Sequence, residues 1–308
     1  MRSLLIVLVV LILAATTVLA LGYIYLSQTS LSTTNGRTNI LLLGVDDAAD
    51  LSDTIMVMSI QHDNSAPEVV LTSIPRDLWV EVPEFGGSKI NAVHALGERN
   101  DYPGGGPALT AATLENVLGD DIHYYATLDF GGFEALVDAV GGVEIEVEQS
   151  INDQRFPERD GAGYDPFTIE PGLQEMDGEQ ALRYARSRQT TSDFDRAYRQ
   201  QQIVVALRDE VLNDGMPDVV NAWNLLNAAE REVATDMNRA DKIRLATLLR
   251  NVDTAEIPRY VIDTSNLLVS SPRDGSSLDP RAGDFSEVQS FFADIFQQTM
   301  IDEYESAF

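Results

Sequence analysis

The sequence contains no cysteine and only three histidines among its 308 residues. The absence of a thiol excludes cysteine-based catalysis. His62, His94 and His123 lie in unrelated contexts without an H-x-x-x-H spacing, which argues against a histidine-rich zinc site. A chain without cysteine fits an exported domain that does not depend on disulfides, although cytosolic proteins can also lack cysteine.

Two common catalytic signatures are missing as well. No G-x-S-x-G segment is present, so the strained serine turn of the α/β-hydrolases is not predicted. Gly104-Gly105-Gly106 is not followed by Gly-Lys-Ser, so it is not a Walker loop, and we interpret it as a flexible loop.

Basic residues are scarce: 21 Lys and Arg stand against 49 Asp and Glu, which gives a formal net charge of -28. Such a charge argues against nucleic acid as a partner and against broad contact with anionic lipid head groups. Five arginines nevertheless fall within seventeen positions, at Arg183, Arg186, Arg188, Arg196 and Arg199. Converging guanidinium groups match phosphate oxygens. A solvated helix face paired with acids is the alternative, and this stretch alone does not decide between the two.

The amino-terminal segment is almost wholly apolar from Leu4 to Leu26, longer than the ~20 residues that a helix needs to cross a bilayer. We therefore predict one transmembrane helix at residues 4–26. A cleaved signal peptide is the alternative, but its apolar region typically spans only ~7 to 15 residues.

The charges around this segment predict its orientation. Arg2 and the terminal amine precede it, and the next charge is Arg37, so the positive-inside rule places residues 1–3 in the cytoplasm. Residues 27–37 are rich in Ser and Thr and are predicted to form a flexible tether. The extracytoplasmic domain then comprises residues 38–308, attached to the cell membrane as a single-pass protein.

The remaining pattern predicts strands that alternate with helices, which is typical of an α/β layered domain. Hydrophobic residues make up 44% of the chain, enough for a substantial core. The predicted strands are Asn39–Val45, Ile55–Ile60, Glu68–Ile74, Leu78–Val82, Tyr124–Asp129, Val143–Val147 and Ile257–Ile262. The predicted helices run from Lys89 to near Gly97, from about Ser192 or Asp193 to Leu212, and over Pro107–Leu118, Phe130–Val140, Glu179–Tyr184, Pro217–Ala229, Arg239–Arg250 and Phe285–Phe296. Between Glu148 and Leu173 we expect a long loop or hairpin.

Carboxylates at predicted strand ends are candidates for chemistry. Asp46 follows the first strand and Asp53 precedes the second. Carboxylate oxygens suit Mg²⁺, which takes one or two of them and completes its shell with water and substrate phosphate. Arginines beside such a site would position phosphate groups and neutralise their charge. The spacing alone is also compatible with turn-capping aspartates.

Helical spacing divides the arginines. Arg196 and Gln200 are one helical turn apart and share a face, whereas Arg199 is predicted to point elsewhere. Arg186 and Arg188 are expected after the short helix, where a backbone spacing of two can aim both side chains the same way. Arg183 is predicted to be a surface or paired residue.

Seven segments together resemble the LytR-CpsA-Psr family of cell-envelope phosphotransferases. They occur in the family's order between Asn39 and Ile203, and they read NILLLGVD, LSDTIMVMSI, TSIPRDLWV, KINAVHALG, FGGFEALVDAVGGVEIEV, MDGEQALRYARSR and DFDRAYRQQQ. A single amino-terminal transmembrane helix is also similar to the family's layout. Agreement among several motifs is much stronger evidence for the resemblance than any single motif.

The resemblance implies an α/β fold with three layers, α/β/α, in which a central mixed sheet lies between helices. It also implies an apolar pocket for the polyprenyl tail of a lipid-linked glycan. Family members transfer a glycopolymer with one phosphate from a polyprenyl-pyrophosphate carrier to peptidoglycan or another envelope acceptor, forming a phosphodiester. We place the catalytic core at residues 39–203 and a helical C-terminal part at residues 204–308.

The resemblance also implies roles for individual residues. Asp46 and Asp53 would bind Mg²⁺. The pyrophosphate contacts would be Arg76, Lys89, Arg186, Arg188, Arg196 and Gln200, with Lys89 the weakest candidate. Arg76 would take part in catalysis, with either Asp53 or Asp77 as the general base.

The chain departs from the family's pattern at Leu51, where many members have arginine. One cation of the usual pocket is therefore missing. Two other functions use the same features: a polyprenyl-pyrophosphate phosphohydrolase with water as acceptor, and a non-catalytic protein that binds lipid-linked glycans or serves as a scaffold.

Overall fold

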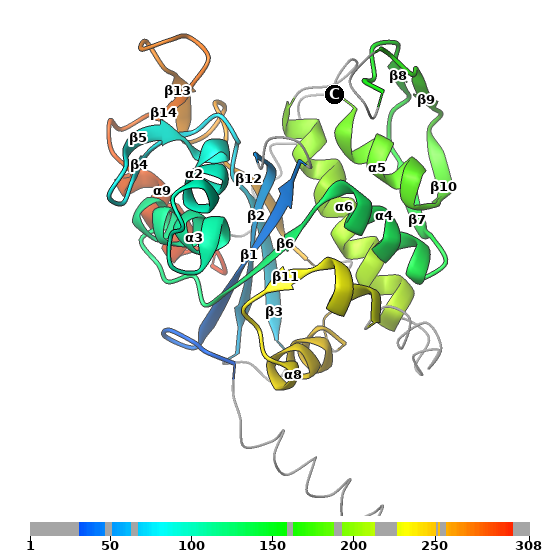
Figure 1. The fold of residues 1–308 in the computed structure, drawn as a ribbon, viewed down its shortest axis with the longest axis horizontal. Helices are drawn as coiled ribbons and strands as arrows, with labels where there is room; N and C mark the ends of the chain where they lie inside the picture. The colour runs from blue at the N-terminus through cyan, green and yellow to red at the C-terminus, as the bar shows by residue number, and fades with distance from the viewer. Residues whose placement is uncertain are drawn as a thin grey trace, which may run out of the picture.

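A six-stranded mixed sheet forms the centre of the molecule in a computed structural model of the protein (Figure 1). The structure describes residues 31–46, 51–62, 67–158, 163–187, 193–212, 227–250, 252 and 257–297. The strands of the sheet, in spatial order, are β11 (Ala234–Thr235), β6 (Tyr124–Leu128), β1 (Arg37–Val45), β2 (Ser52–Gln61), β3 (Glu68–Ser73) and β12 (Arg259–Val261).

Both antiparallel and parallel pairs occur in the sheet. β1 pairs antiparallel with β2, and β2 pairs antiparallel with β3. β1 also pairs parallel with β6, and β3 pairs parallel with β12. The prediction of a central mixed sheet is therefore confirmed. The pairing places the C-terminal ends of β1 and β3 and the start of β2 at the same end of the sheet, where the predicted polar residues lie.

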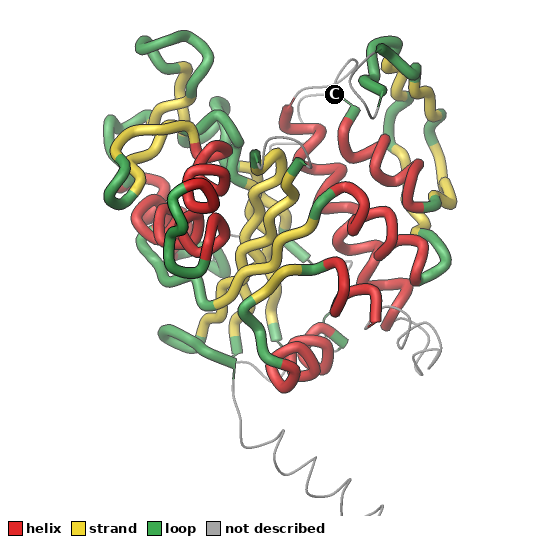
Figure 2. Tube along the Cα trace, viewed as in Figure 1, coloured by secondary structure: helices red, strands yellow, loops and turns green. Residues whose placement is uncertain are grey.

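Helices cover both faces of the sheet, and Figure 2 shows the two helical layers with the strands between them. One layer contains α2 (Val93–Arg99), α3 (Gly105–Leu118) and α9 (Ser286–Ala293). The other contains α4 (Phe130–Ala139), α5 (Gly178–Arg186) and α6 (Asp193–Leu212). Helix α8 (Arg239–Leu249) lies near the end of the sheet at which β1 begins. This arrangement is the predicted α/β/α order.

The alternation of side chains along β1 explains the two cores. Leu41 and Leu43 pack into the cluster under α3 and α9, whereas Ile40 and Leu42 face the cluster that includes residues of α6 and α8. Successive residues of a strand point to opposite faces, so a continuous apolar strand serves both layers.

Among the described residues, four small two-stranded sheets lie beside these layers. They pair β4 (Trp79–Val82) with β5 (Gly86–Lys89), β7 (Val143–Val147) with β10 (Gly172–Met176), β8 (Ile151–Asp153) with β9 (Phe167–Ile169), and β13 (Leu268–Ser270) with β14 (Leu278–Pro280). A short 3₁₀ helix, η1 (Ile90–Ala92), precedes α2. The β8–β9 pair confirms a hairpin in the region predicted as a loop or hairpin. The description of residues 204–308 as helical was incomplete, since β11 to β14 lie there.

The glycine triplet at 104–106 is a correction to the sequence prediction. It was expected to be a flexible loop, but Gly104 is the left-handed N-cap of α3, with φ of 85°, and Gly105 and Gly106 begin that helix. A Cβ on Gly106 would lie 2.3 Å from the carbonyl oxygen of His94. Glycine is needed here because α3 begins against the backbone of α2.

The predicted transmembrane helix at 4–26 lies outside the described residues. Within the parts of the chain that the structure describes, no helix has the length and apolar character needed to cross a membrane. The second half of the predicted tether does not fit that prediction, because Leu31 is buried and the backbone amide of Ser32 donates to the hydroxyl of Tyr124. Residues 31–36 therefore belong to the folded domain.

Candidate functional site

The β1–β2 hairpin positions the two predicted metal ligands. The backbone amide of Asp46 donates to the carbonyl of Leu51 at 3.0 Å, and Val45 pairs with Ser52. Because Gly44 pairs with Thr54, Asp53 is an extra residue in β2, and this irregularity is a β-bulge. Bulges redirect a side chain locally and are common beside active sites. Asp53 is thereby aimed toward the arginine that follows β3.

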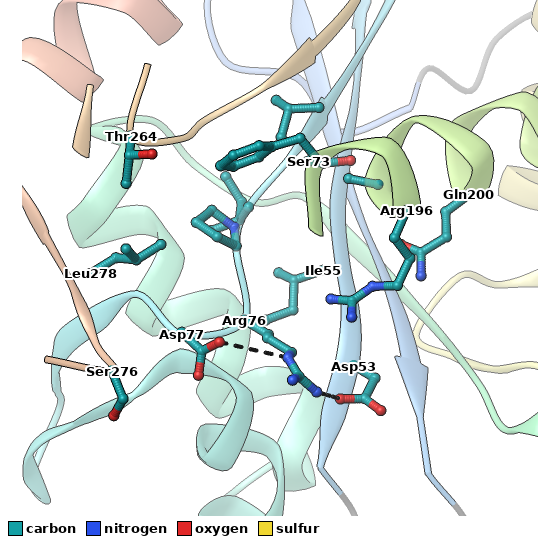
Figure 3. A pocket seen from close by; sticks show the side chains of 15 residues that line it. Asp53, Ile55, Ser73, Arg76, Asp77, Arg196, Gln200, Thr264, Ser276 and Leu278 are labelled. Carbon is teal, nitrogen blue, oxygen red and sulfur yellow. Dashed lines mark hydrogen bonds and ion pairs between the residues drawn. The ribbon is translucent and has the colours of Figure 1, made fainter. Parts of the chain in front are cut away.

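Arg76 lies in the turn after β3. Pro75 fixes the backbone ahead of it, and the carbonyl oxygen of Arg76 accepts a bond of 3.2 Å from the amide of Asn91. The Arg76 Nη1 donates to Asp53 Oδ1 at 2.7 Å, and its Nε lies 3.7 Å from Asp77 Oδ2 (Figure 3). The guanidinium is therefore held between two of the predicted catalytic carboxylates, with 23% of its side chain exposed.

Lys89 has a different neighbourhood from the other predicted head-group residues. Its Nζ donates to Asp77 Oδ1 at 2.9 Å and to the carbonyl and hydroxyl oxygens of Ser276, each at 3.2 Å. Lys89 thus links the turn after β3 to the segment between β13 and β14. It does not line either of the two cavities described below.

Helix α6 confirms the predicted division between its arginines. Arg196 is buried, and with Gln200 it faces the turn that carries Arg76 (Figure 3). Arg199 points away from this face: its Nε donates to the carbonyl of Tyr184 at 2.9 Å, and its Nη2 donates to the carbonyl of Ser187. Arg199 therefore satisfies carbonyls at the end of α5, which a helix leaves without internal partners.

Helix α5 contributes Arg186. Sequence reasoning placed this residue after the short helix, but it is the last residue of α5. Its guanidinium carbon lies 4.0 Å from the centroid of the Phe130 ring at the start of α4. Arg183 is paired, as predicted, with Asp165 at 3.1 Å. Arg188 lies outside the described residues.

A cavity of about 760 Å³ lies between the sheet and the layer of α4, α5 and α6. One part of its wall is apolar and comes from both layers: Leu42, Leu43, Met56, Ala126, Leu128, Phe130, Phe133, Leu136, Leu182, Ala185, Ile203, Val204, Leu207 and Val233. The charged residues of its wall are Asp46, Asp53, Arg76, Asp129, Asp153, Arg155, Arg186 and Arg196. An apolar pocket with a few polar groups at defined positions is the usual form of a ligand site.

A second cavity, of about 280 Å³, adjoins the first. The two share four wall residues, Asp53, Arg76, Arg196 and Gln200. The remaining wall of the smaller cavity comes from β2, the end of β3 and its turn, the start of α6, and the segments around β12 and β14. The predicted site residues Arg76, Asp53, Asp77, Arg196 and Gln200 therefore meet at one place, and Asp46 and Arg186 join them across the larger cavity.

The carboxylates suit a hard cation in their chemistry. Asp46 and Asp53 both line the larger cavity and present oxygen donors from the two arms of one hairpin. Asp129 and Asp153 are engaged elsewhere: Asp129 caps α4 through the amide of Gly132, and Asp153 accepts from the hydroxyl of Ser187. Among the described residues no group of three or more His, Cys, Asp or Glu side chains could hold a metal. A pair of carboxylates remains sufficient for Mg²⁺, which keeps waters and substrate oxygens as its other ligands.

Three features of the site escaped sequence reasoning. One is Arg155, which adds a cation to the larger cavity from the loop after β8. Thr264 and Ser276 come from a region to which the sequence pattern assigned no function. Isolated polar residues in loops carry no periodic signal, so only the fold brings them to the site.

The comparisons with known proteins agree on one family. A sequence model of the LytR_cpsA_psr family matches residues 22–278. A relative from Oceanobacillus iheyensis, named polyisoprenyl-teichoic acid–peptidoglycan teichoic acid transferase TagU, is 34% identical over 218 residues, which are 69% of this chain and 62% of that protein. The regulatory protein MsrR of Staphylococcus aureus is 33% identical over 58% of this chain and 50% of its own length. The chain thus spans less than two thirds of the length of these curated relatives.

Solved structures give the same fold. The crystal structure of B. subtilis TagV superposes with a TM-score of 0.67 at 25% identity, covering 87% of this chain and 100% of that one. TagT bound to LI-WTA superposes with a TM-score of 0.64 at 21% identity, covering 88% of this chain and 95% of that one.

Proposed function

Because the chain belongs to the LytR_cpsA_psr family, we propose that it transfers a glycopolymer phosphate from a polyprenyl-pyrophosphate carrier to an acceptor hydroxyl of the cell envelope. The single observation that carries this proposal is the larger cavity, in which a long apolar wall leads to a group of four described arginines and two hairpin carboxylates. The name of the relative TagU, a teichoic acid transferase, supports the same class of reaction.

The two parts of the cavity match the two parts of such a carrier. Burial of each CH₂ group of the prenyl chain contributes about 0.8 kcal/mol, which favours the apolar wall made by β1, β6, α4 and α6. The pyrophosphate oxygens would be bound by Arg76, Arg186 and Arg196, because guanidinium groups donate paired hydrogen bonds to phosphate. Gln200, one turn along α6 from Arg196, would add a neutral donor.

The reaction is a substitution at the phosphorus next to the glycan. The acceptor hydroxyl oxygen forms a bond to this phosphorus, the bond to the bridging oxygen breaks, and polyprenyl monophosphate leaves with that oxygen. The hydroxyl proton passes to Asp53 or Asp77, both of which line the smaller cavity beside Arg76. Arg76 would stabilise the charge that develops on the leaving phosphate.

Mg²⁺ bound by Asp46 and Asp53 would neutralise pyrophosphate charge and lower the barrier to loss of the leaving group. In this arrangement Asp53 has two tasks, since it also accepts the hydrogen bond from Arg76 at 2.7 Å. The carboxylate thereby fixes the guanidinium beside the position of the metal.

The predicted apolar helix at residues 4–26 would hold the protein in the cell membrane with its amino terminus in the cytoplasm. The catalytic domain would then lie outside the cytoplasm, next to both the lipid carrier and its partner, peptidoglycan or another envelope acceptor. This topology is part of the proposal.

The proposal is tested with the full-length chain, a synthetic polyprenyl-pyrophosphate glycan and soluble peptidoglycan strands. We expect a phosphodiester-linked product and one polyprenyl monophosphate per transfer. Chelation of divalent cations should stop transfer and added Mg²⁺ should restore it. The variants Asp46→Ala and Arg76→Ala should fold like the wild type and should have a lower rate of transfer.

Two results would exclude transfer. Release of the glycan phosphate into solution at a rate that does not depend on the acceptor concentration would identify a phosphohydrolase. Tight binding of the carrier that is independent of Mg²⁺ and accompanied by no turnover would identify a binding or scaffold protein.

A further inference from the structure

We propose that the smaller cavity is the subsite for the acceptor, and that it receives a neutral sugar unit of a glycan strand. This inference rests on the proposed function, since it assigns the second substrate of the same reaction. It gives a role to residues of the C-terminal part of the chain, among them Thr264, Ser276 and Leu278, which line this cavity.

The smaller cavity lies where an acceptor could attack the phosphorus. In a substitution at phosphorus the attacking and leaving oxygens lie on opposite sides of the phosphorus atom. The two cavities meet at Asp53, Arg76, Arg196 and Gln200. Beyond this shared wall the larger cavity is lined by residues of α4 and α5, whereas the smaller one is lined by Ser276 and Leu278 of the β13–β14 hairpin. Figure 1 shows that hairpin on the other side of the sheet from α4 and α5. A phosphorus atom held at the shared wall would therefore be open to attack from the smaller cavity.

The size and lining of the cavity indicate the kind of group it takes. At about 280 Å³ it is at the low end for ligand sites, so it is suited to a single compact unit rather than a long chain. Its described wall combines hydroxyl groups of Ser73, Thr264 and Ser276 with the apolar side chains of Val261 and Leu278. A sugar ring presents both hydroxyl groups and an apolar face of C–H groups, and this mixed wall matches it.

The charges of the wall favour a neutral ligand. Its described charged residues are two arginines and two carboxylates, and both arginines, Arg76 and Arg196, also belong to the larger cavity. Asp77 is the acid that lines the smaller cavity alone, and its oxygens face Lys89 at 2.9 Å and Arg76 at 3.7 Å. A second anionic phosphate would meet this carboxylate, whereas a sugar hydroxyl can donate a hydrogen bond to it.

The wall made by the C-terminal segment is held in place by hydrogen bonds. Lys89 links Asp77 to Ser276, and the amide of Leu278 donates to the carbonyl of Asp77 at 2.9 Å. Asp274 accepts a bond from the hydroxyl of Ser277 and bonds from the amides of Ser277 and Ser276, and these bonds lower the pKa of that carboxyl. A preformed wall positions a ligand at a small entropic cost.

The test introduces a large side chain at the wall of the smaller cavity. Thr264 is exposed and faces the cavity, so Thr264→Trp fills space without disturbing the core (Figure 3). Val269→Trp is the matched control, because Val269 is also exposed, lies in β13 and is not part of the wall. Transfer by the full-length chain is measured against the concentration of soluble peptidoglycan strands, and binding of the polyprenyl-pyrophosphate glycan is measured without acceptor.

We expect Thr264→Trp to raise the acceptor KM by about tenfold or more, since overlap with a bound group typically costs this much. The Kd for the lipid carrier should stay within about twofold of the wild-type value, and Val269→Trp should change neither quantity. An unchanged acceptor KM in Thr264→Trp, or an equal loss of carrier binding, would overturn the assignment of this cavity. Failure of the wild-type chain to transfer at all would instead refute the proposed function.

Discussion

Replacement of Arg76 by lysine separates the charge of this residue from its geometry. Arg76 donates to Asp53 at 2.7 Å through Nη1 while its Nε lies 3.7 Å from Asp77, so one guanidinium spans two carboxylates and still faces both cavities. The ammonium group of lysine keeps the positive charge but cannot present the same fork of donors. We therefore expect Arg76→Lys to fold normally and to transfer poorly.

The size of the expected loss in transfer follows from the hydrogen bonds that Arg76→Lys would remove. A hydrogen bond to a charged group contributes about 1.5 to 3 kcal/mol, so loss of one such bond in the transition state lowers kcat/KM by about 10- to 150-fold. The ion pair itself is partly exposed, so little of this effect should appear as lost stability. The assay is the initial rate of transfer at fixed carrier and varied acceptor concentration, with the melting temperature measured in parallel.

Arg37→Lys is the matched control. Arg37 also pairs with a carboxylate, Asp120 at 3.1 Å, and donates to the carbonyls of Phe292 and Ala293, but it lines neither cavity. This variant should lose stability and keep its transfer rate per folded molecule. If Arg76→Lys transferred within twofold of the wild-type rate, Arg76 would act as a simple point charge and the role given to its fork would be wrong.

Three further predictions follow from single contacts. Phe130→Leu removes the ring that lies 4.0 Å from Arg186, and with it about 0.5 to 2 kcal/mol of cation–π attraction, so the Kd for the lipid carrier should rise about 2- to 30-fold in a binding titration; an unchanged Kd would show that the ring does not hold Arg186. Arg199→Met leaves buried carbonyls without their donor and should lower the free energy of unfolding, measured by urea denaturation, by about 2 to 5 kcal/mol; a loss below about 0.5 kcal/mol, the usual effect of a surface substitution, would contradict its role. Burial lowers the pKa of His123 below its usual 6.5, so the unfolded state binds the proton more readily and stability should fall as the pH drops below about 6.5; His123→Gln should flatten this dependence in unfolding titrations, and an unaltered slope would count against it.

Local patterns predicted most of the central elements. The apolar runs along β1, β2 and β3 specify these strands, because most of their residues are buried. Helix α5 begins at Gly178, one residue before the predicted start at Glu179, and the side chain of Asp177 caps it by accepting from the amide of Gln180. The mixed sheet itself came from the resemblance to a family and not from the pattern of single strands.

Short elements without an apolar period were missed. β5 has the sequence Gly-Gly-Ser-Lys, which carries no strand signal, and it forms because β4 offers it an edge. β13 and β14 are three residues each and depend on the docking of Leu278 against the backbone of Asp77. Their pairing is a product of the tertiary structure.

The same reasoning explains what was and was not predicted of the site. The common face of Arg196 and Gln200 follows from helical spacing, and the structure brings both to the wall shared by the two cavities. The bulge that redirects Asp53 cannot be read from the sequence, because it is defined by pairing with β1. The adjoining smaller cavity was not foreseen for a similar reason, since its wall joins residues as far apart in the sequence as Asp53 and Leu278.

The most direct test of the central claim is a crystal structure of the protein with a bound polyprenyl-pyrophosphate glycan. The account predicts that the prenyl chain lies along the apolar wall between the sheet and α6, and that the pyrophosphate contacts Arg76, Arg186 and Arg196 beside Asp53. A carrier bound elsewhere on the protein, or one whose pyrophosphate lies away from these arginines, would contradict it.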